Sequence, residues 1–301
     1  MKLKILLSWM AWLFLLPAIA QQDPLNGLYF NNNLLINPAY AGLYEQLSAN
    51  LTHRAQWTGV EGAPASSAFN VHSSLYQNRI GAGLMVIQDQ LGVTNSLEVS
   101  AAYAYKISML KGTLSLGLQT SLYNIRNDYS KLLVKDADDA FVQDVNLSRP
   151  NFGTGALYVS ERLMLGVSVP RLLKMNSEGE GVSTVSAYQR HLYLQGAGVI
   201  DLNSKMSVRP AAYLRYTGGA PANYDLRADL IYDKMLMAGV FSRSFEQYGM
   251  SFGIFPRQRF RLIYQYELPL SPLVNRYNTH EISLGIDLAA FKSHQAVFRY
   301  F

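Results

Sequence analysis

Apolar and polar side chains alternate along most of this chain after its first 40 or so residues. In residues 44–57, for example, Leu47, Ala49 and Leu51 are separated by serine, asparagine and other polar residues. Residues 281–288 repeat the pattern with isoleucine and leucine at every second position. Successive side chains of a β-strand point to opposite faces, so this period of two predicts strands with one apolar and one polar side.

The alternating segments predict about fourteen strands. We expect them at 44–57, 66–77, 79–88, 95–107, 112–125, 152–160, 162–169, 189–200, 205–216, 223–233, 234–243, 247–255, 259–268 and 279–289. Short connections (at 77–78, 108–111, 160–162, 201–204, 233–234 and 256–258) alternate with generally longer ones (at 58–65, 89–94, 126–151, 170–188, 217–222, 244–246 and 269–278). Outer-membrane barrels show this arrangement, with short periplasmic turns and longer extracellular loops. The prediction is therefore an all-β, antiparallel transmembrane barrel with both termini in the periplasm.

The N-terminus has the features of a secretory signal peptide. Lys2 and Lys4 precede a short apolar run, and Ala18-Ile19-Ala20 is a small-x-small cleavage site. Beyond it, no apolar run approaches the ~18 residues that a membrane helix needs. We therefore expect a signal peptide at 1–20, a periplasmic N-terminal segment at 21–43, the barrel at 44–290 and a C-terminal tail at 291–301.

Composition supports lipid as the apolar environment of the strands. Charged residues make up only 16% of the chain, against about 25% in soluble domains, while Tyr, Phe and Gly are frequent. The alternative is a soluble β-sandwich or lipocalin-like barrel, which has to bury every apolar face in one core. The net charge of +5 includes Lys2 and Lys4 and is too mild to predict nucleic-acid binding. There is no cysteine, which excludes disulfides, thiol catalysis and thiolate metal sites.

In the predicted strands 205–216, 223–233 and 259–268, the charged residues share one face, opposite the apolar face. Arginine at the bilayer midplane of a barrel costs roughly 2–4 kcal/mol, so we expect the charges to face the lumen. The lumen charges predicted in this way are Arg209, Arg215, Asp225, Arg227, Asp229, Arg259, Arg261 and Glu267. Opposite charges on neighbouring strands favour pairing that fills or narrows the pore over a path for solutes.

Two N-terminal segments resemble a known family. One is Asn37-Pro38-Ala39-Tyr40-Ala41-Gly42, and the other runs from Arg54 through Gln56, Trp57, Gly59 and Gly62 to Pro64. Together with the terminal Arg299-Tyr300-Phe301, they resemble the PorP/SprF family of outer-membrane proteins of the type IX secretion system. The resemblance covers the whole mature chain in length and layout.

The same motifs also have a physical interpretation. Asn37-Pro38 starts a turn, and Gly42 can take the positive φ that lets the chain bend into the first strand. Trp57 falls at the outer end of that strand, as an interfacial anchor does, and Gly59, Gly62 and Pro64 stiffen the loop. These residues either close and seal the barrel or form an outer docking surface for an exported protein.

Catalytic, metal and nucleotide sites have little support in the sequence. No histidine falls in a recognisable Ser–His–acid arrangement. Asp136, Asp138, Asp139 and Asp144 lack the spacing of a calcium loop, so a solvated acidic loop is the better interpretation. No glycine-rich segment follows a strand and opens a helix. We expect no enzyme activity and no cofactor.

Three functions follow, in order of preference. The resemblance implies an outer-membrane protein that works with type IX components and exports or anchors a surface protein through its extracellular loops. Such cargo includes large adhesins, some of which serve gliding motility, and the candidate docking loops are 58–65, 126–151 and 170–188. The alternative is a passive porin or solute channel with a charged lumen. An outer-membrane hydrolase is the third.

Overall fold

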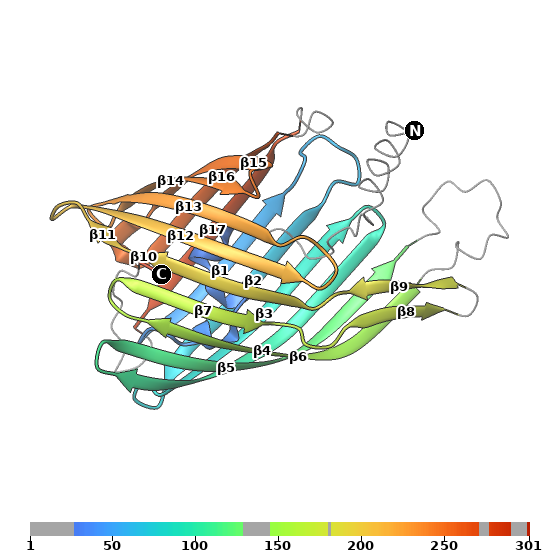
Figure 1. Cartoon of the computed structure of the whole chain (residues 1–301), viewed down its shortest axis with the longest axis horizontal. Helices are drawn as coiled ribbons and strands as arrows, with labels where there is room; N and C mark the ends of the chain where they lie inside the picture. The colour runs from blue at the N-terminus through green and yellow to red at the C-terminus, as the bar shows by residue number, and fades with distance from the viewer. Residues whose placement is uncertain (1–26, 129–144, 180–181, 271–276, 290–299) are drawn as a thin grey trace, which may run out of the picture.

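All the described strands except β8 and β9 close into one antiparallel barrel (Figure 1). The computed structural model describes residues 27–128, 145–179, 182–270, 277–289 and 300–301. The strands are β1 (Leu47–Ala55), β2 (Ala65–Leu75), β3 (Ile80–Leu91), β4 (Thr94–Met109), β5 (Gly112–Asn127), β6 (Val145–Val159), β7 (Leu163–Val169), β8 (Met175–Gly179), β9 (Val182–Tyr188), β10 (His191–Gly198), β11 (Ile200–Asp201), β12 (Met206–Thr217), β13 (Asn223–Tyr232), β14 (Leu236–Arg243), β15 (Gln247–Ile254), β16 (Phe260–Pro269) and β17 (Thr279–Leu288).

The first and last strands of the wall pair with each other, which closes the barrel. Leu51 of β1 faces Leu284 of β17, and β10 joins β7 to β12 on the other side. β10 and β11 both pair with β12 in one continuous register, so they act as a single strand of the wall. Counted in this way, the wall has fourteen strands, and the predicted fold is confirmed.

The structure differs from the expected strands at a few positions. The predicted loop 170–188 contains a separate hairpin of β8 and β9, which projects beyond the wall (Figure 1). β6 begins at Val145 instead of 152, and the connection expected at 89–94 is a tight turn between β3 and β4. The predicted signal peptide, the acidic stretch 136–144 and most of the predicted tail lie outside the described residues.

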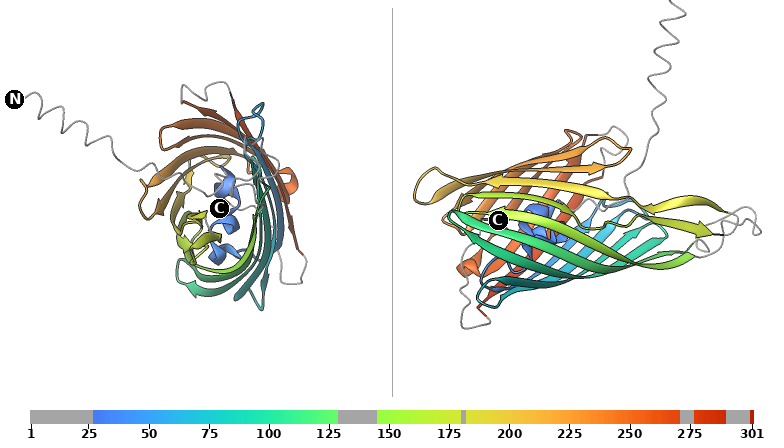
Figure 2. Two further views of the ribbon diagram at one scale, coloured as in Figure 1. Left: turned by 90° about the vertical axis from the view of Figure 1, so that its right-hand side faces the viewer. Right: turned by 60° about the horizontal axis from the view of Figure 1, so that its bottom comes forward.

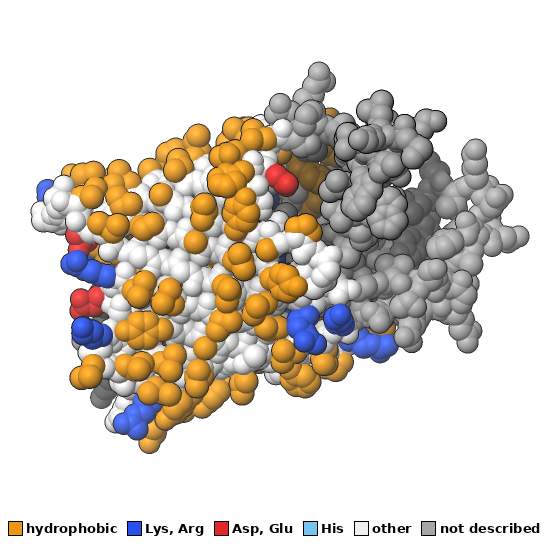
Figure 3. Space-filling model, in the orientation of Figure 1, with side chains coloured by type: hydrophobic (Ala, Val, Ile, Leu, Met, Phe, Trp, Pro, Cys, Tyr) orange, Lys and Arg blue, Asp and Glu red, His pale blue; other side chains and the backbone are white. Residues whose placement is uncertain are grey.

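Apolar side chains cover the outside of the wall and polar ones line its inside. On β1, Leu51 is exposed while Ser48, Asn50, Thr52 and Arg54 are buried. Every exposed Lys or Arg among the described residues lies at one of the two ends of the barrel, and Figure 3 shows the charged side chains of one face gathered there. None of the described helices is both long enough and apolar enough to span a bilayer.

Leu226, which points outward near the middle of β13, tests this assignment of faces. We expect Leu226→Arg to lower the free energy of unfolding in lipid vesicles by about 2–4 kcal/mol, because a cation near the bilayer midplane is poorly solvated. Urea unfolding, followed by the heat-modifiable mobility of the folded barrel, measures the change. Leu236→Arg, next to the β13–β14 turn, is the control and should cost about 0–1 kcal/mol. Equal costs at both positions would contradict the assignment.

The segment that precedes β1 lies inside the barrel (Figure 2). It contains three short 3₁₀ helices, η1 (Leu28–Asn31), η2 (Asn33–Leu35) and η3 (Pro38–Tyr40). The expectation that residues 21–43 form a periplasmic segment is therefore wrong for its described part, residues 27–43. The physical reason is that this segment buries Leu34, Leu35 and Ile36 against the barrel wall. We call residues 27–43 the lumen segment.

Candidate functional site

The lumen segment turns sharply at the Asn37-Pro38 motif. The Asn37 side chain accepts a hydrogen bond from the Ala39 amide at 3.0 Å, and Pro38 occupies the first helical position of η3. The Asn37 side-chain amide also donates to the Ala156 carbonyl of β6 at 3.2 Å. The motif therefore both shapes the segment and attaches it to the wall.

Glycines on the inner face of the wall make room for the segment. A Cβ on Gly117 of β5 would lie 2.1 Å from the Ala39 nitrogen, and one on Gly155 of β6 would lie 2.2 Å from the Asn37 Oδ1 atom. A side chain at either position would overlap the segment. The close approach of the segment's backbone to Gly117, and of the Asn37 side chain to Gly155, thus requires glycine at these two places.

Three consecutive asparagines attach the first half of the segment. The side-chain oxygens of residues 31–33 each accept a hydrogen bond from the wall, one from β2 and two from β12. The donors are Arg209 to Asn31 at 2.9 Å, Asn70 to Asn32 at 3.0 Å, and the Tyr213 hydroxyl to Asn33. These contacts hold η1 and η2 between β2 and β12.

Apolar side chains fill the space between the segment and the wall. Leu34, Leu35 and Ile36 belong to one buried cluster with residues of β3, β6, β7 and β10. The Phe30 ring meets the Tyr213 ring edge-on, with centroids 4.3 Å apart. A cavity of about 30 Å³ remains beside Leu35 and Ile36. That is room for about one water molecule.

The C-terminal residue also reaches the lumen. Phe301 is buried, and its main-chain oxygen accepts a hydrogen bond from the Tyr40 hydroxyl at 2.7 Å. Arg209 donates to the Tyr300 carbonyl. The lumen segment and the C-terminal residue are therefore joined through Tyr40, which belongs to the first sequence motif.

Gly42 ends the lumen segment with a φ of +55°. Its amide donates to the Nδ1 atom of His72 at 3.1 Å, and its carbonyl accepts a hydrogen bond from the Lys106 ammonium. A left-handed backbone beside a buried histidine and lysine suits glycine best. The chain therefore bends toward β1 at Gly42, where the first motif places a glycine.

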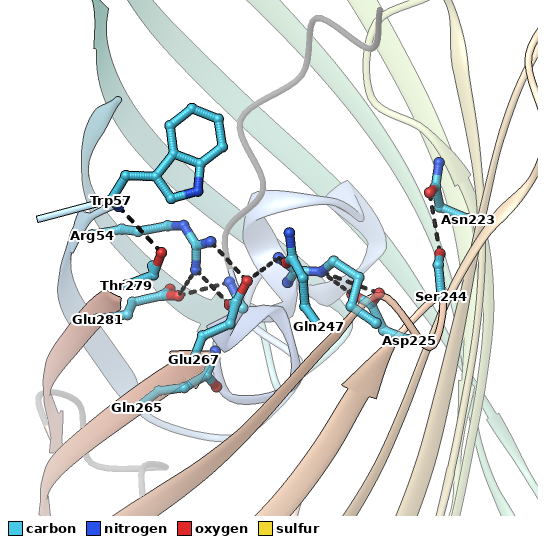
Figure 4. A network of polar contacts seen from close by, with 12 residues as sticks. Arg54, Trp57, Asn223, Asp225, Ser244, Gln247, Gln265, Glu267, Thr279 and Glu281 are labelled. Carbon is cyan, nitrogen blue, oxygen red and sulfur yellow. Dashed lines mark hydrogen bonds and ion pairs between the residues drawn. The ribbon is translucent and has the colours of Figure 1, made fainter. Parts of the chain in front are cut away.

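Buried charges of the wall form a first network near the end of the barrel that carries the longer loops (Figure 4). Arg54 of β1 lies 3.1 Å from Glu267 of β16 and 3.2 Å from Glu281 of β17. Glu267 also pairs with Arg243 of β14 at 3.2 Å, which in turn pairs with Asp225 of β13. The Gly27 amide donates to Glu281 at 2.7 Å, so the lumen segment is bound to this network.

A second network lies between β12 and β13. Asp229 accepts from Arg209 at 2.6 Å and from Arg227 at 2.7 Å. The Arg227 guanidinium also lies 5.3 Å from the centre of the Phe30 ring. Through Arg209 and Arg227, this network too contacts the lumen segment.

The structure places seven of the eight predicted lumen charges along the inner face of β12, β13 and β16. Arg209, Asp225, Arg227, Asp229 and Glu267 belong to the two networks described above, while Arg261 pairs with Asp287 of β17. Arg215 is buried on β12. Arg259 is the exception, because it is exposed in the connection that precedes β16.

The second motif shapes the loop between β1 and β2. The Gln56 amide donates to the Pro64 carbonyl at 2.9 Å, which closes the base of the loop. Trp57, Gly59 and Gly62 have φ values of +50°, +100° and +71°. Trp57 is partly buried, and its amide lies 3.4 Å from the Thr279 hydroxyl (Figure 4). Arg54, the first residue of this motif, is therefore a lumen charge, whereas the rest of the motif belongs to the loop.

Several residues that hold the lumen segment were not predicted from the sequence. They include Asn31, Asn32 and Asn33, and their wall partners Asn70 and Tyr213. These asparagines follow no periodic pattern, and three in a row were the one available signal. Among the described residues, no group of three or more His, Cys, Asp or Glu side chains could hold a metal ion.

Comparison with known proteins adds the following. A family model described as type IX secretion system membrane protein PorP/SprF matches residues 18–286. A Pseudomonas aeruginosa FadL homologue is similar over 92% of this chain and 96% of its own, with a TM-score of 0.50 and 11% identity. The Acinetobacter baumannii outer membrane protein Omp33 covers 82% of this chain and 99% of its own, with a TM-score of 0.46 and 10% identity. At such low identity, the likeness to the FadL homologue shows the barrel fold alone. No curated protein matches this chain.

Proposed function

We propose that this chain, which belongs to the PorP/SprF family of type IX secretion system membrane proteins, exports or anchors a partner surface protein. In this proposal, the partner is adhesin-like, the outer-membrane barrel binds it through the longer loops, and no chemical step is involved. The short turns and the C-terminal end face the periplasm in this proposal. The expectation of an N-terminus on the same side is not supported by the first described residue, because Gly27 lies at the longer-loop end, where its amide donates to Glu281. Association with type IX secretion components follows from the family.

The occupied lumen is the observation that carries this proposal. Residues 27–43 and Phe301 occupy the interior and are hydrogen-bonded to β2, β6, β12 and β17. A barrel filled in this way has little space for solutes, so its useful surfaces are those outside the lumen. This supports a binding role over a passive channel.

The longer loops and the strands beneath them form the candidate docking surface. β4 and β5 have 16 residues each and β6 has 15, whereas β14 and β15 on the other side have 8 each. The β8–β9 hairpin projects beyond the wall at the same end (Figures 1 and 2). The wall is therefore higher at β4, β5 and β6 than at β14 and β15, and in this proposal the partner binds against the higher side.

The free edge of β6 is a specific part of that surface. β6 pairs with β7 only from Thr154 to Val159, so within the described residues the stretch 145–153 has β5 as its sole strand partner. The Phe152 carbonyl accepts from Leu172 on the open side, and by alternation the backbone of Ser148 points the same way. An extended segment of the partner could pair with this edge.

Deletion of the gene in its host tests the function. We expect one or a few proteins to disappear from the cell surface or to appear in the medium, as measured by comparing both proteomes with the parent. Restoring the gene should reverse the change. An unchanged surface and medium would contradict the export or anchoring role.

The same assay tests the β6 edge separately. Ser148→Pro removes an edge amide, and we expect it to release the partner that the deletion identifies. Ser148→Ala removes the same hydroxyl but keeps the amide, and it should retain the partner. Retention by both variants would refute docking at this edge and leave the anchoring role intact.

A further inference from the structure

The short turns of the barrel share a chemical pattern. Six short connections join β2–β3, β4–β5, β6–β7, β11–β12, β13–β14 and β15–β16 at one end of the wall, which we call the short-turn rim. Every one of them carries at least one exposed cation. These are Arg79, Lys111, Arg162, Lys205, Lys234, and Arg257 with Arg259.

Each of these connections also presents a large exposed apolar side chain, within it or next to it. These side chains are Tyr76, Leu110, Leu163, Leu202, Met235 and Phe260. The Tyr76 side chain is 72% exposed, and Leu110 is fully exposed. An apolar group beside a cation suits the boundary between acyl chains and headgroups, where the first enters the lipid and the second stays at the polar surface.

Most of the rim cations are available for a ligand. Arg162 pairs with Asp201 at 2.7 Å, whereas none of the other six forms a salt bridge within the described part of the chain. Among the described residues, the exposed acidic side chains at this end are Glu45, Glu161, Asp201 and Asp233. Within the same residues, exposed cations therefore outnumber exposed carboxylates at the rim, seven to four.

The described residues at the opposite end of the barrel form no such ring. Its exposed described cations are confined to the stretch from β5 to β10, at Arg126, Arg149, Lys174 and Arg190. On the other side, the β1–β2 and β14–β15 loops carry the exposed Glu61 and Glu246 instead. A ligand that contacts the short-turn rim on all sides must itself surround the barrel, and lipid does so whereas a single docked protein does not.

We propose that the short-turn rim binds the phosphate groups of anionic phospholipids in the adjacent leaflet. The six apolar side chains enter the acyl region, and the cations pair with headgroup phosphates around the perimeter. This ring of contacts fixes the depth of the barrel in the membrane. The inference concerns lipid and does not depend on the partner protein.

Native mass spectrometry of the full-length protein tests this inference. The protein is released from mixed micelles with equal amounts of phosphatidylcholine and phosphatidylglycerol, and the retained lipids are counted. The neutral variant combines Arg79→Gln, Lys111→Gln, Lys205→Gln and Lys234→Gln. The matched control keeps the charges with Arg79→Lys, Lys111→Arg, Lys205→Arg and Lys234→Arg.

We expect the wild type and the charge-keeping control to retain phosphatidylglycerol in preference to phosphatidylcholine. Each cation near an anionic headgroup layer adds roughly fivefold to binding, so the neutral variant should lose at least about tenfold of this preference. Heat-modifiable mobility shows whether that variant is folded, and the milder pair Lys111→Gln and Lys205→Gln replaces it if it is not. No preference in the wild type, or equal preference in the neutral variant, would overturn the proposal.

Discussion

Removal of residues 27–41 is expected to turn a closed barrel into an ion-conducting one. In planar bilayers, the wild type should show no steady conductance, and the shortened protein should show discrete, long-lived openings. The effect is large because the segment occupies the centre of the lumen and contributes buried residues from Tyr29 to Ala41.

The size of the wall supports this expectation. Barrels of about eight strands are filled by their own side chains, whereas those of 16 to 18 strands leave an aqueous channel. Fourteen strands lie closer to the second case. The polar inner face, with Ser, Asn and paired charges, would be wetted once the segment is gone.

Tyr40→Phe is the matched control for this experiment. It removes the hydroxyl that donates to Phe301 and keeps the ring, so the segment retains its asparagine and glycine contacts. We expect it to stay closed, with brief openings at most. Steady conductance in the wild type would favour the channel function, and a closed shortened protein would show that wall side chains alone seal the lumen.

Replacing Arg54 by methionine should destabilise the barrel by about 3–5 kcal/mol. Arg54 is 2% exposed and bridges two buried carboxylates, at 3.1 Å from Glu267 and 3.2 Å from Glu281. Its loss removes the salt bridge to Glu281 and leaves Glu267 with its salt bridge to Arg243. The urea midpoint of the barrel in vesicles measures the change.

Arg162→Met is the control for the Arg54 variant. Arg162 also forms an ion pair, with Asp201 at 2.7 Å, but the two side chains are 67% and 38% exposed. Water screens such a pair, so the cost should be about 0–1 kcal/mol. If both variants cost the same, the lumen network would contribute no more than a surface pair does.

The strands of this protein are predictable because their signal is local. Each wall residue faces either lipid or lumen, so the two environments are recorded at alternate positions of the sequence itself. The fourteen wall strands were expected close to where they lie, and the charges of β12 and β13 fall on the predicted face. The hairpin of β8 and β9 escaped prediction, since it lies outside this two-sided environment.

The candidate site is less predictable because its contacts join distant parts of the chain. Arg54 meets partners more than 200 residues away, and Asn31 meets a partner 178 residues away. The sequence marked Asn37 and Gly42 as turn formers, yet it did not show that Gly117 and Gly155 leave room for them. The fit between these wall glycines and the lumen segment depends on the register of the wall strands, which the sequence pattern does not give.

By itself, the sequence determined the strand pattern, the apolar outer face and the family of this protein. The tertiary structure alone decided that residues 27–43 occupy the lumen. The physical reason is that a short non-periodic segment has no preferred environment until a closed wall surrounds it. The wall then supplies apolar surface for Leu34, Leu35 and Ile36, and hydrogen-bond donors for the three asparagines.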